Sequence, residues 1–110
     1  MGSTAEHQEL VNAAHLAAGS LPQVRIWKQV NGVFRSIDGS RLIKVGLVGS
    51  SDLTGILLRG GRRLEAEAKT GKAKQTKEQR SFAHMIVKYG GVFILFHSVE
   101  EFIEKLKLEM

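Results

Sequence analysis

The chain has 110 residues, a hydrophobic fraction of 43%, no cysteine and a formal net charge of +5. This composition predicts one folded domain, and it excludes disulfides, thiolate metal sites and a membrane-spanning run of apolar residues. The basic charge favours nucleic acid as a partner, and the absence of cysteine favours a cytoplasmic location. No secretory leader is visible, and no membrane partner is expected.

The first predicted element is a helix over residues 3–18, which ends at Gly19. Ser3 and Glu6 have the spacing of a capping box, which begins a helix. At about 100° per residue, one side of this helix is an apolar stripe that contains Leu10, Ala13, Ala14 and Ala17. Glu6 falls within this stripe, and a carboxylate buried there would need a partner.

Short strands follow the first helix. Residues 24–30 and 33–37 are expected to be extended, and Asn31 with Gly32 between them predicts a hairpin turn. Asp38 and Gly39 close the second of these strands, and residues 41–45 form a third short extended piece. A loop rich in glycine and serine follows this piece and leads to Asp52.

The second half of the chain predicts strands and helices in alternation. Residues 53–58 form a compact apolar run that predicts a buried strand, and residues 64–70 return beside it. Two capping boxes, Thr76 with Gln79 and Ser98 with Glu101, predict helices on either side of a strand over residues 92–96. The expected fold class is α/β, with a mixed central sheet flanked by helices.

The segment LEAEAKT, residues 64–70, alternates as a strand, so Glu65, Glu67 and Lys69 share one face. A solvated outer face would explain these charges, but an active site would also do so. Asp52 precedes the strand that is expected to pair with this one, so Asp52 and Glu67 would meet at one sheet end. Two carboxylates at short range repel each other unless a cation lies between them, and oxygen ligands suit Mg²⁺. Lys69 could then act on an attacking water or stabilise charge on phosphorus.

This pattern resembles the PD-(D/E)XK nucleases, and more closely their virus-type replication-repair nuclease (VRR-Nuc) branch. The resemblance runs over about half of the chain, from Gly46 to Leu95, and includes VGLVGSSDLTGIL and GRRLEAEAKTGKAKQTKEQRSFAHMIVKYGGVFIL. The segment TAEHQEL in the first helix also matches. One position departs from the superfamily pattern, because Ser51 precedes the aspartate where the superfamily has proline.

The resemblance implies a role for each matching residue. Asp52 and Glu67 would bind the metal together with the backbone carbonyl of Ala68, and Lys69 would be the catalytic lysine. The implied fold is a restriction-endonuclease-like core, which would form one VRR-Nuc-like domain over residues 1–110. The implied cofactor is Mg²⁺, which Mn²⁺ is expected to replace.

Two helix residues and one further glutamate have alternative interpretations. The resemblance implies that Glu6 adds a carboxylate to the metal site and that Gln79 assists catalysis. Either residue could instead do no more than cap its own helix. Glu65 shares the face of Glu67, but the spacing to Lys69 selects Glu67, so Glu65 is expected to be a sheet-end or surface residue.

Basic residues gather in two turns that are expected to flank the metal site and to bind DNA phosphates. The first turn contains Arg59, Arg62 and Arg63, and the second turn and its following residues contain Lys72, Lys74, Lys77 and Arg80. A merely solubilising surface is the alternative.

No aromatic residues alternate with the lysines, so a stacking platform for single strands is not indicated. The four histidines are scattered and do not indicate a zinc site.

The sequence therefore predicts a Mg²⁺-dependent DNA nuclease that hydrolyses phosphodiester bonds. The resemblance implies a phage-encoded homodimer, acting in a bacterial host on branched DNA such as four-way (Holliday) junctions. A two-fold dimer could cut paired strands symmetrically. The alternative from another class is a non-catalytic basic nucleic-acid-binding module, which would explain the charge but not the spacing of Asp52, Glu67 and Lys69.

Overall fold

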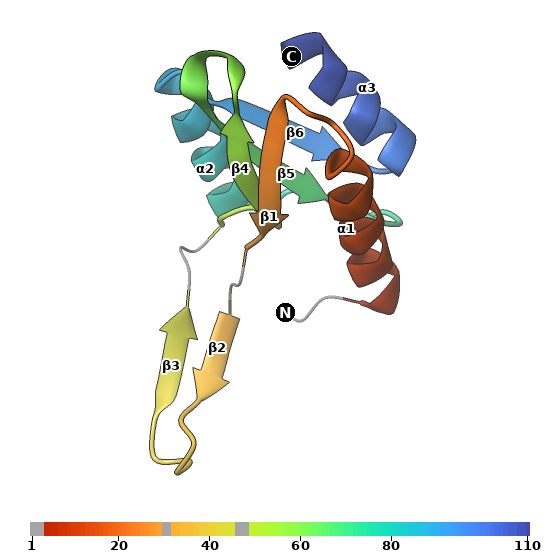
Figure 1. The fold of residues 1–110 in the computed structure, drawn as a ribbon. Coiled ribbons are helices and arrows are strands. Elements are labelled where there is room, and N and C mark those ends of the chain that lie inside the picture. Colours follow the sequence, from red (N-terminus) through yellow and green to blue (C-terminus); the bar gives the residue numbers. More distant parts are fainter. Residues whose placement is uncertain (1–3, 30–31, 46–48) are drawn as a thin grey trace.

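A computed structural model of the chain describes residues 4–29, 32–45 and 49–110 (Figure 1). Among these residues, no helix is long and apolar enough to cross a membrane. A single turn of 3₁₀ helix, Arg59–Gly61, joins two of the strands. The other elements, in chain order, are α1 (Ala5–Ala18), β1 (Val24–Lys28), β2 (Gly32–Arg35), β3 (Leu42–Val45), β4 (Leu53–Leu57), β5 (Arg62–Ala68), α2 (Lys77–Lys88), β6 (Val92–Phe96) and α3 (Val99–Glu109).

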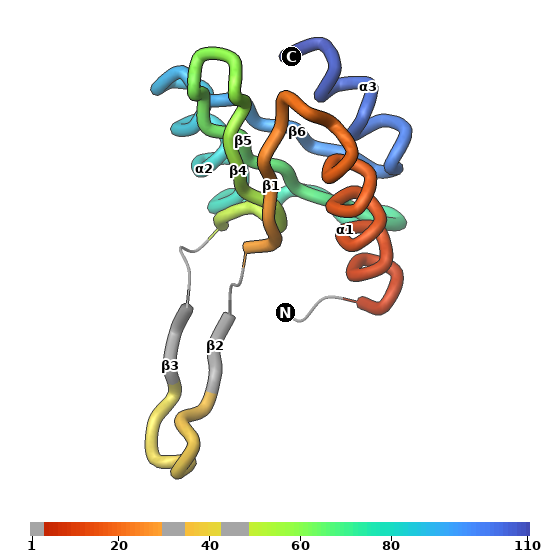
Figure 2. Tube along the Cα trace, viewed as in Figure 1, coloured from red at the N-terminus to blue at the C-terminus, as the bar shows by residue number. Residues whose placement is uncertain are grey.

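The main sheet has four strands in the order β1-β4-β5-β6. The pairs β1–β4 and β4–β5 are antiparallel, whereas β5 and β6 are parallel, with α2 as the crossover between them. This arrangement confirms a mixed α/β fold with helices on the sheet. The trace in Figure 2 shows α1 and α3 side by side on one side of the sheet and α2 on the other.

The predicted hairpin between the first two strands is wrong. Strand β1 pairs with β4, and β2 pairs with β3 in a separate two-stranded sheet that extends away from the main sheet in Figure 1. The turn of this hairpin contains Asp38, which accepts hydrogen bonds from Ser36 and Ser40. These bonds, first that from the Ser40 side chain, lower the pKa of Asp38 to about 2. Asn31, which was expected to form the turn, lies outside the described residues.

The start and the buried side of α1 also differ from the prediction. The helix is capped by Thr4, whose Oγ1 accepts a hydrogen bond from the His7 backbone N–H at 3.0 Å. Ser3 lies outside the described residues. The buried positions of α1 are Val11, Ala14 and Ala18, and Glu6 is exposed. The inward stripe is therefore rotated by about one residue relative to the prediction, and Glu6 is outside it.

One apolar core lies between the sheet and the helices α1 and α3. It contains alternate residues of β4, β5 and β6, together with Phe96 and Phe102, whose ring centroids lie 4.7 Å apart. On the opposite face, Phe82 and Ile86 of α2 are buried. Because α2 packs on β5 and β6, the polar side chains of β5 lie on a face that is partly covered.

Gly49 holds the loop that leads to Asp52 close to the start of α2. Its φ is +81°, and a Cβ placed on it would lie 2.5 Å from the backbone C and O of Glu78. Only glycine allows this close approach, because any side chain here would need to displace backbone atoms. The loop before β4 and the first turn of α2 are therefore fixed to each other.

We predict that Gly49→Ala is more destabilising than Gly71→Ala. Both glycines have a positive φ, but a Cβ on Gly71 would meet no atom within 4 Å. Gly71→Ala should cost only the backbone strain, about 1–2 kcal/mol, whereas Gly49→Ala should cost roughly 1–3 kcal/mol more through overpacking. Urea denaturation of both variants measures the difference, and equal losses would contradict a close approach at Gly49.

Candidate active site

The pairing of β4 with β5 places Asp52 beside the end of β5. The Asp52 N–H donates to the carbonyl of Ala66 at 3.1 Å, and the Asp52 carbonyl accepts from the Gln29 N–H at 2.8 Å. Its carboxylate Oδ2 accepts a hydrogen bond from the Ala68 N–H at 2.9 Å. Asp52 thus extends the sheet by one residue beyond β4, and the predicted closeness of Asp52 to this end of β5 is confirmed.

Glu67 is almost completely buried, with a relative exposure of 1%. Its Oε2 lies 3.2 Å from the Lys69 Nζ, which is an ion-pair distance without hydrogen-bond geometry. Burial raises the pKa of Glu67, and the nearby Asp52 raises it further, while Lys69 and more weakly Gln75 oppose the increase. Glu67 is therefore a carboxylate whose charge the surrounding residues only partly compensate.

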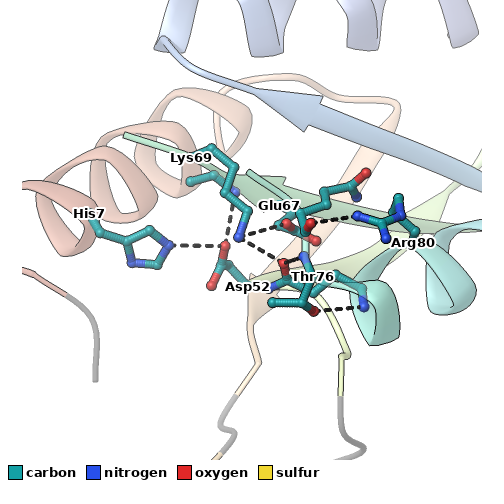
Figure 3. A network of polar contacts seen from close by, with 9 residues as sticks. His7, Asp52, Glu67, Lys69, Thr76 and Arg80 are labelled. Atoms are coloured by element: carbon teal, nitrogen blue, oxygen red, sulfur yellow. Dashed lines mark hydrogen bonds and ion pairs between the residues drawn. The ribbon is translucent and has the colours of Figure 1, made fainter. Parts of the chain in front are cut away.

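Lys69 contacts Glu67 and also Gln79 of α2, as Figure 3 shows. Its Nζ donates to the Gln79 Oε1 at 2.8 Å, and the same oxygen accepts from the Thr76 N–H at 2.8 Å. The Gln79 N–H in turn donates to the Thr76 hydroxyl, which completes the predicted capping box. Gln79 thus caps its helix and also holds the lysine, so the two alternatives do not exclude each other.

His7 belongs to this site although the sequence analysis did not select it. Its Nε2 lies 3.3 Å from the Asp52 Oδ2, and its side chain is only 17% exposed (Figure 3). The sequence contained an indication of this position, because His7 stands four residues before Val11 and seven before Ala14, on the side of α1 that is buried. The helix is rich in alanine, so its sequence is compatible with more than one buried side, and only the packing of α1 determines which side is buried.

Unpartnered buried polar atoms are concentrated at this site. Within the described residues, the buried side-chain nitrogen and oxygen atoms that lack a hydrogen-bond partner are the His7 Nδ1, the Gln75 Nε2 and both carboxylate oxygens of Glu67. Such atoms are costly, and folded proteins seldom retain them without a functional reason. These atoms lie near Asp52 and Lys69, so partners from outside the chain, either water or a ligand, could complete their hydrogen bonds.

The expectation that Glu65 is a surface or sheet-end residue is wrong. Glu65 is 1% exposed, and its carboxylate accepts hydrogen bonds from the hydroxyls of Ser51 and Thr54. Arg63 Nε adds an ion pair at 2.9 Å. The face that holds Glu65 and Glu67 is therefore not solvated. The side chain of Ser51, which stands where the superfamily has proline, helps to bind Glu65 beside the Asp52 loop.

In the part of the chain that the structure describes, the other predicted site residues form no hydrogen bond or ion pair with Asp52, Glu67 or Lys69. Glu6 is exposed, so its role as a metal ligand stays a prediction without support from burial. The arginine turn lies at the end of the β4–β5 pair that is distant from Asp52, because Arg62 stands opposite Leu57, although Arg63 reaches Glu65. Arg62 contacts Glu109 at the end of α3. The second group does follow Lys69 in the chain and is exposed: Lys72, Lys74, Lys77 and Arg80.

The donor set suits a hard divalent cation. Asp52 and Glu67 supply carboxylate oxygens, and the Ala68 carbonyl faces the same strand edge as the Ala68 N–H that binds Asp52. Within the described residues, no three His, Cys, Asp or Glu side chains form a complete metal-binding group. Mg²⁺ does not need such a group, because it is usually held by one or two carboxylates and keeps several waters.

A comparison of the chain with models of known protein families finds no match, and neither does a comparison with curated proteins. Membership of the VRR-Nuc family therefore stays a prediction. It rests on the spacing of Asp52, Glu67 and Lys69 in combination with the helix that carries Gln79 and the strand that follows Gly90 and Gly91. What the structure adds is independent of that resemblance, because the contacts and the burial follow from the fold itself.

We predict that Glu67→Gln makes the stability of the metal-free protein less dependent on pH. A carboxyl with a raised pKa binds more protons in the folded state, so the free energy of unfolding falls as the pH rises above the ordinary value of 4.5. The slope for one proton is at most about 1.4 kcal/mol per pH unit. Glu67→Gln should lose this contribution, as measured by urea denaturation between pH 4.5 and 7.

The exposed Glu104 of α3 provides the matched control, and Glu104→Gln should follow the wild-type pH profile. If Glu67→Gln also follows the wild-type profile, the burial of Glu67 does not disfavour its charge.

Proposed function

We propose that the chain is a Mg²⁺-dependent nuclease of the PD-(D/E)XK type that hydrolyses phosphodiester bonds in DNA. The observation that carries the proposal is the buried Glu67 carboxylate, whose pKa stays raised, with Asp52 nearby, although Lys69 lies 3.2 Å away. A cation would supply the further positive charge that this carboxylate lacks. Asp52, Glu67 and the carbonyl of Ala68 would hold it, and Mn²⁺ should replace Mg²⁺.

In the proposed reaction the metal, Lys69 and Gln79 have different roles. When bound, Mg²⁺ supplies Lewis acidity toward a phosphoryl oxygen and activation of water. Lys69 is held by Gln79 at 2.8 Å and by Glu67 at 3.2 Å, so its ammonium has a fixed position beside the carboxylates. From there it orients the attacking water or stabilises the negative charge that develops on phosphorus. Because Gln79 fixes the lysine through α2, it acts as a positioning residue.

DNA is the polyanion proposed as the substrate. The exposed cations that follow Lys69 would contact its phosphates, which makes binding dependent on salt. The proposal retains branched DNA, including four-way junctions, and a two-fold homodimer from the resemblance to the VRR-Nuc family. A non-catalytic nucleic-acid-binding module is the competing outcome, and it predicts DNA binding that needs no metal and produces no cleavage.

The test is a panel of labelled single-stranded, duplex, flap and four-way-junction DNAs, incubated with Mg²⁺, with Mn²⁺ and with EDTA. Cleavage that requires metal supports the nuclease, and binding of all DNAs without any cleavage supports the module. Sizing of the protein alone and on the junction in the same buffers tests the homodimer.

We predict that Lys69→Ala and Asp52→Ala separate catalysis from metal binding. Lys69→Ala should still bind Mn²⁺ in calorimetry, while turnover falls roughly 10²–10³-fold through lost stabilisation of the transition state. Asp52→Ala should lose both, because it removes an anionic ligand. Lys107→Ala on the exposed side of α3 is the control and should retain both properties. Turnover that survives in Lys69→Ala would exclude the lysine from the chemistry.

We also predict that His7→Ala weakens the binding of Mg²⁺ and Mn²⁺ by similar factors of about 10–100, because groups that orient a ligating carboxylate have effects of this size. The Thr4 cap uses the backbone N–H of His7, so the substitution leaves the helix start intact. His15→Ala on the same helix is the control. A loss confined to Mn²⁺ would instead make His7 a direct nitrogen ligand, since imidazole suits transition metals better than Mg²⁺.

A further inference from the structure

The sheet face that carries Glu67 has a second polar region outside the proposed metal site. Helix α2 packs on the β5 and β6 side of this face, whereas β1 and β4 leave Trp27 with 53% exposure. Here the surface forms a shallow, open hollow, and the residues that line it include Trp27, Gln29, Thr54, Ile56 and Arg63. A tryptophan this exposed at the edge of a sheet is not needed for the core, whose residues lie on the other face.

The strand register places this hollow beside the carboxylates. Trp27 stands opposite Thr54, and Thr54 stands opposite Glu65. Two residues further along the same strands, Gln29 is hydrogen-bonded to Asp52 and β5 reaches Glu67. At about 3.3 Å per residue, the row that contains Trp27 lies roughly 7 Å from the row that contains the metal ligands. The hollow therefore begins next to the proposed active site.

The far rim of the hollow carries one arginine, Arg63, which stands opposite Ile56. Arg25 stands opposite Ile56 on the other neighbouring strand, but its guanidinium donates to the carbonyls of Pro22 and Val24. Arg63 is 63% exposed although its Nε is fixed to the buried Glu65 at 2.9 Å. This contact gives Glu65 a role, because it holds the guanidinium in place before any ligand binds. A preorganised arginine loses less conformational entropy on binding an anion.

We propose that this hollow binds an unpaired nucleotide next to the scissile phosphate, with its base stacked on Trp27 and a phosphate held by Arg63. The proposal rests on the nuclease function proposed above and specifies the substrate that this function would take. An exposed aromatic face beside a cation is what proteins use to bind unpaired bases, whereas bases inside a duplex are covered by their neighbours. The hollow thus selects DNA that has a single-stranded segment or a branch point at the cut.

The first test uses Trp27 as its own reporter, because it is the only tryptophan of the chain. The wild-type protein is titrated in EDTA, so that no cleavage occurs, with a fluorescently labelled single strand, a flap and a fully paired duplex. Anisotropy of the DNA label measures binding, and tryptophan fluorescence measures contact with Trp27. We expect strong quenching with the single strand and the flap, and weak quenching at equal saturation with the duplex.

Variants identify the two contacts. Trp27→Ala should weaken binding of the flap roughly 5- to 100-fold, the range expected for loss of one stacked base, and Trp27→Phe should lose less. Tyr89→Ala is the matched control, since Tyr89 is 77% exposed at the end of α2. Arg63→Gln keeps a donor for Glu65 and should reduce the slope of log affinity against log salt by about 1. Circular dichroism verifies that each variant is folded.

Three outcomes would overturn the proposal: unchanged fluorescence at saturating DNA, equal quenching by the duplex and the flap, or normal flap binding by Trp27→Ala. None of these affects the nuclease proposal, which depends on metal-dependent cleavage by the wild type. Conversely, selective quenching without cleavage of any DNA would leave the nucleotide site in place and reject the nuclease.

Discussion

The site depends on one energetic constraint, the burial of the Glu67 carboxylate with incomplete compensation of its charge. Leaving such a group unsatisfied costs roughly 1–3 kcal/mol or more, which is a large part of the stability of a small protein. The sheet cannot move Glu67 away, because β5 is paired on both sides, with β4 and with β6. The fold reduces the cost by bringing Lys69 within 3.2 Å, but this contact alone leaves the pKa of Glu67 raised.

The features that the sequence predicted correctly are the local ones. The expected capping residues Thr76 and Ser98 each begin a helix. Thr76 and Gln79 form a complete capping box, whereas at Ser98 only one of the two bonds is present, from the Glu101 N–H to the Ser98 hydroxyl. The apolar run of β6 is also a strand as expected. Each depends on residues within one or two turns, so a pattern of a few positions determines it. The closeness of Asp52 to the end of β5 was also predictable, because a short turn joins β4 to β5.

The features that the sequence missed depend on contacts between distant segments. The turn signal at Asn31 and Gly32 is local, but β1 gains a longer pairing with β4, whose five residues match it along their whole length. In α1 the alanines at 13, 14, 17 and 18 give two neighbouring stripes of the helix nearly equal hydrophobicity. Packing against α3 and the sheet buries the stripe that contains His7. Trp27 and Arg63 are far apart in the chain and line the same hollow only because their strands pair with opposite edges of β4.

The segment LEAEAKT contains two buried carboxylates that can be compared directly. Glu65 and Glu67 are equally buried on the same face of β5, and each lies beside one cation, Arg63 or Lys69. Glu65 differs in that the hydroxyls of Ser51 and Thr54 also bind it, whereas neither oxygen of Glu67 accepts a hydrogen bond from the described residues. Hydrogen bonding to hydroxyl groups is therefore one difference between the two carboxylates, and the nearby Asp52, which raises the pKa of Glu67, is another. Glu67 is therefore the buried carboxylate of β5 with capacity for a further partner, and this capacity is the basis of the metal site proposed above.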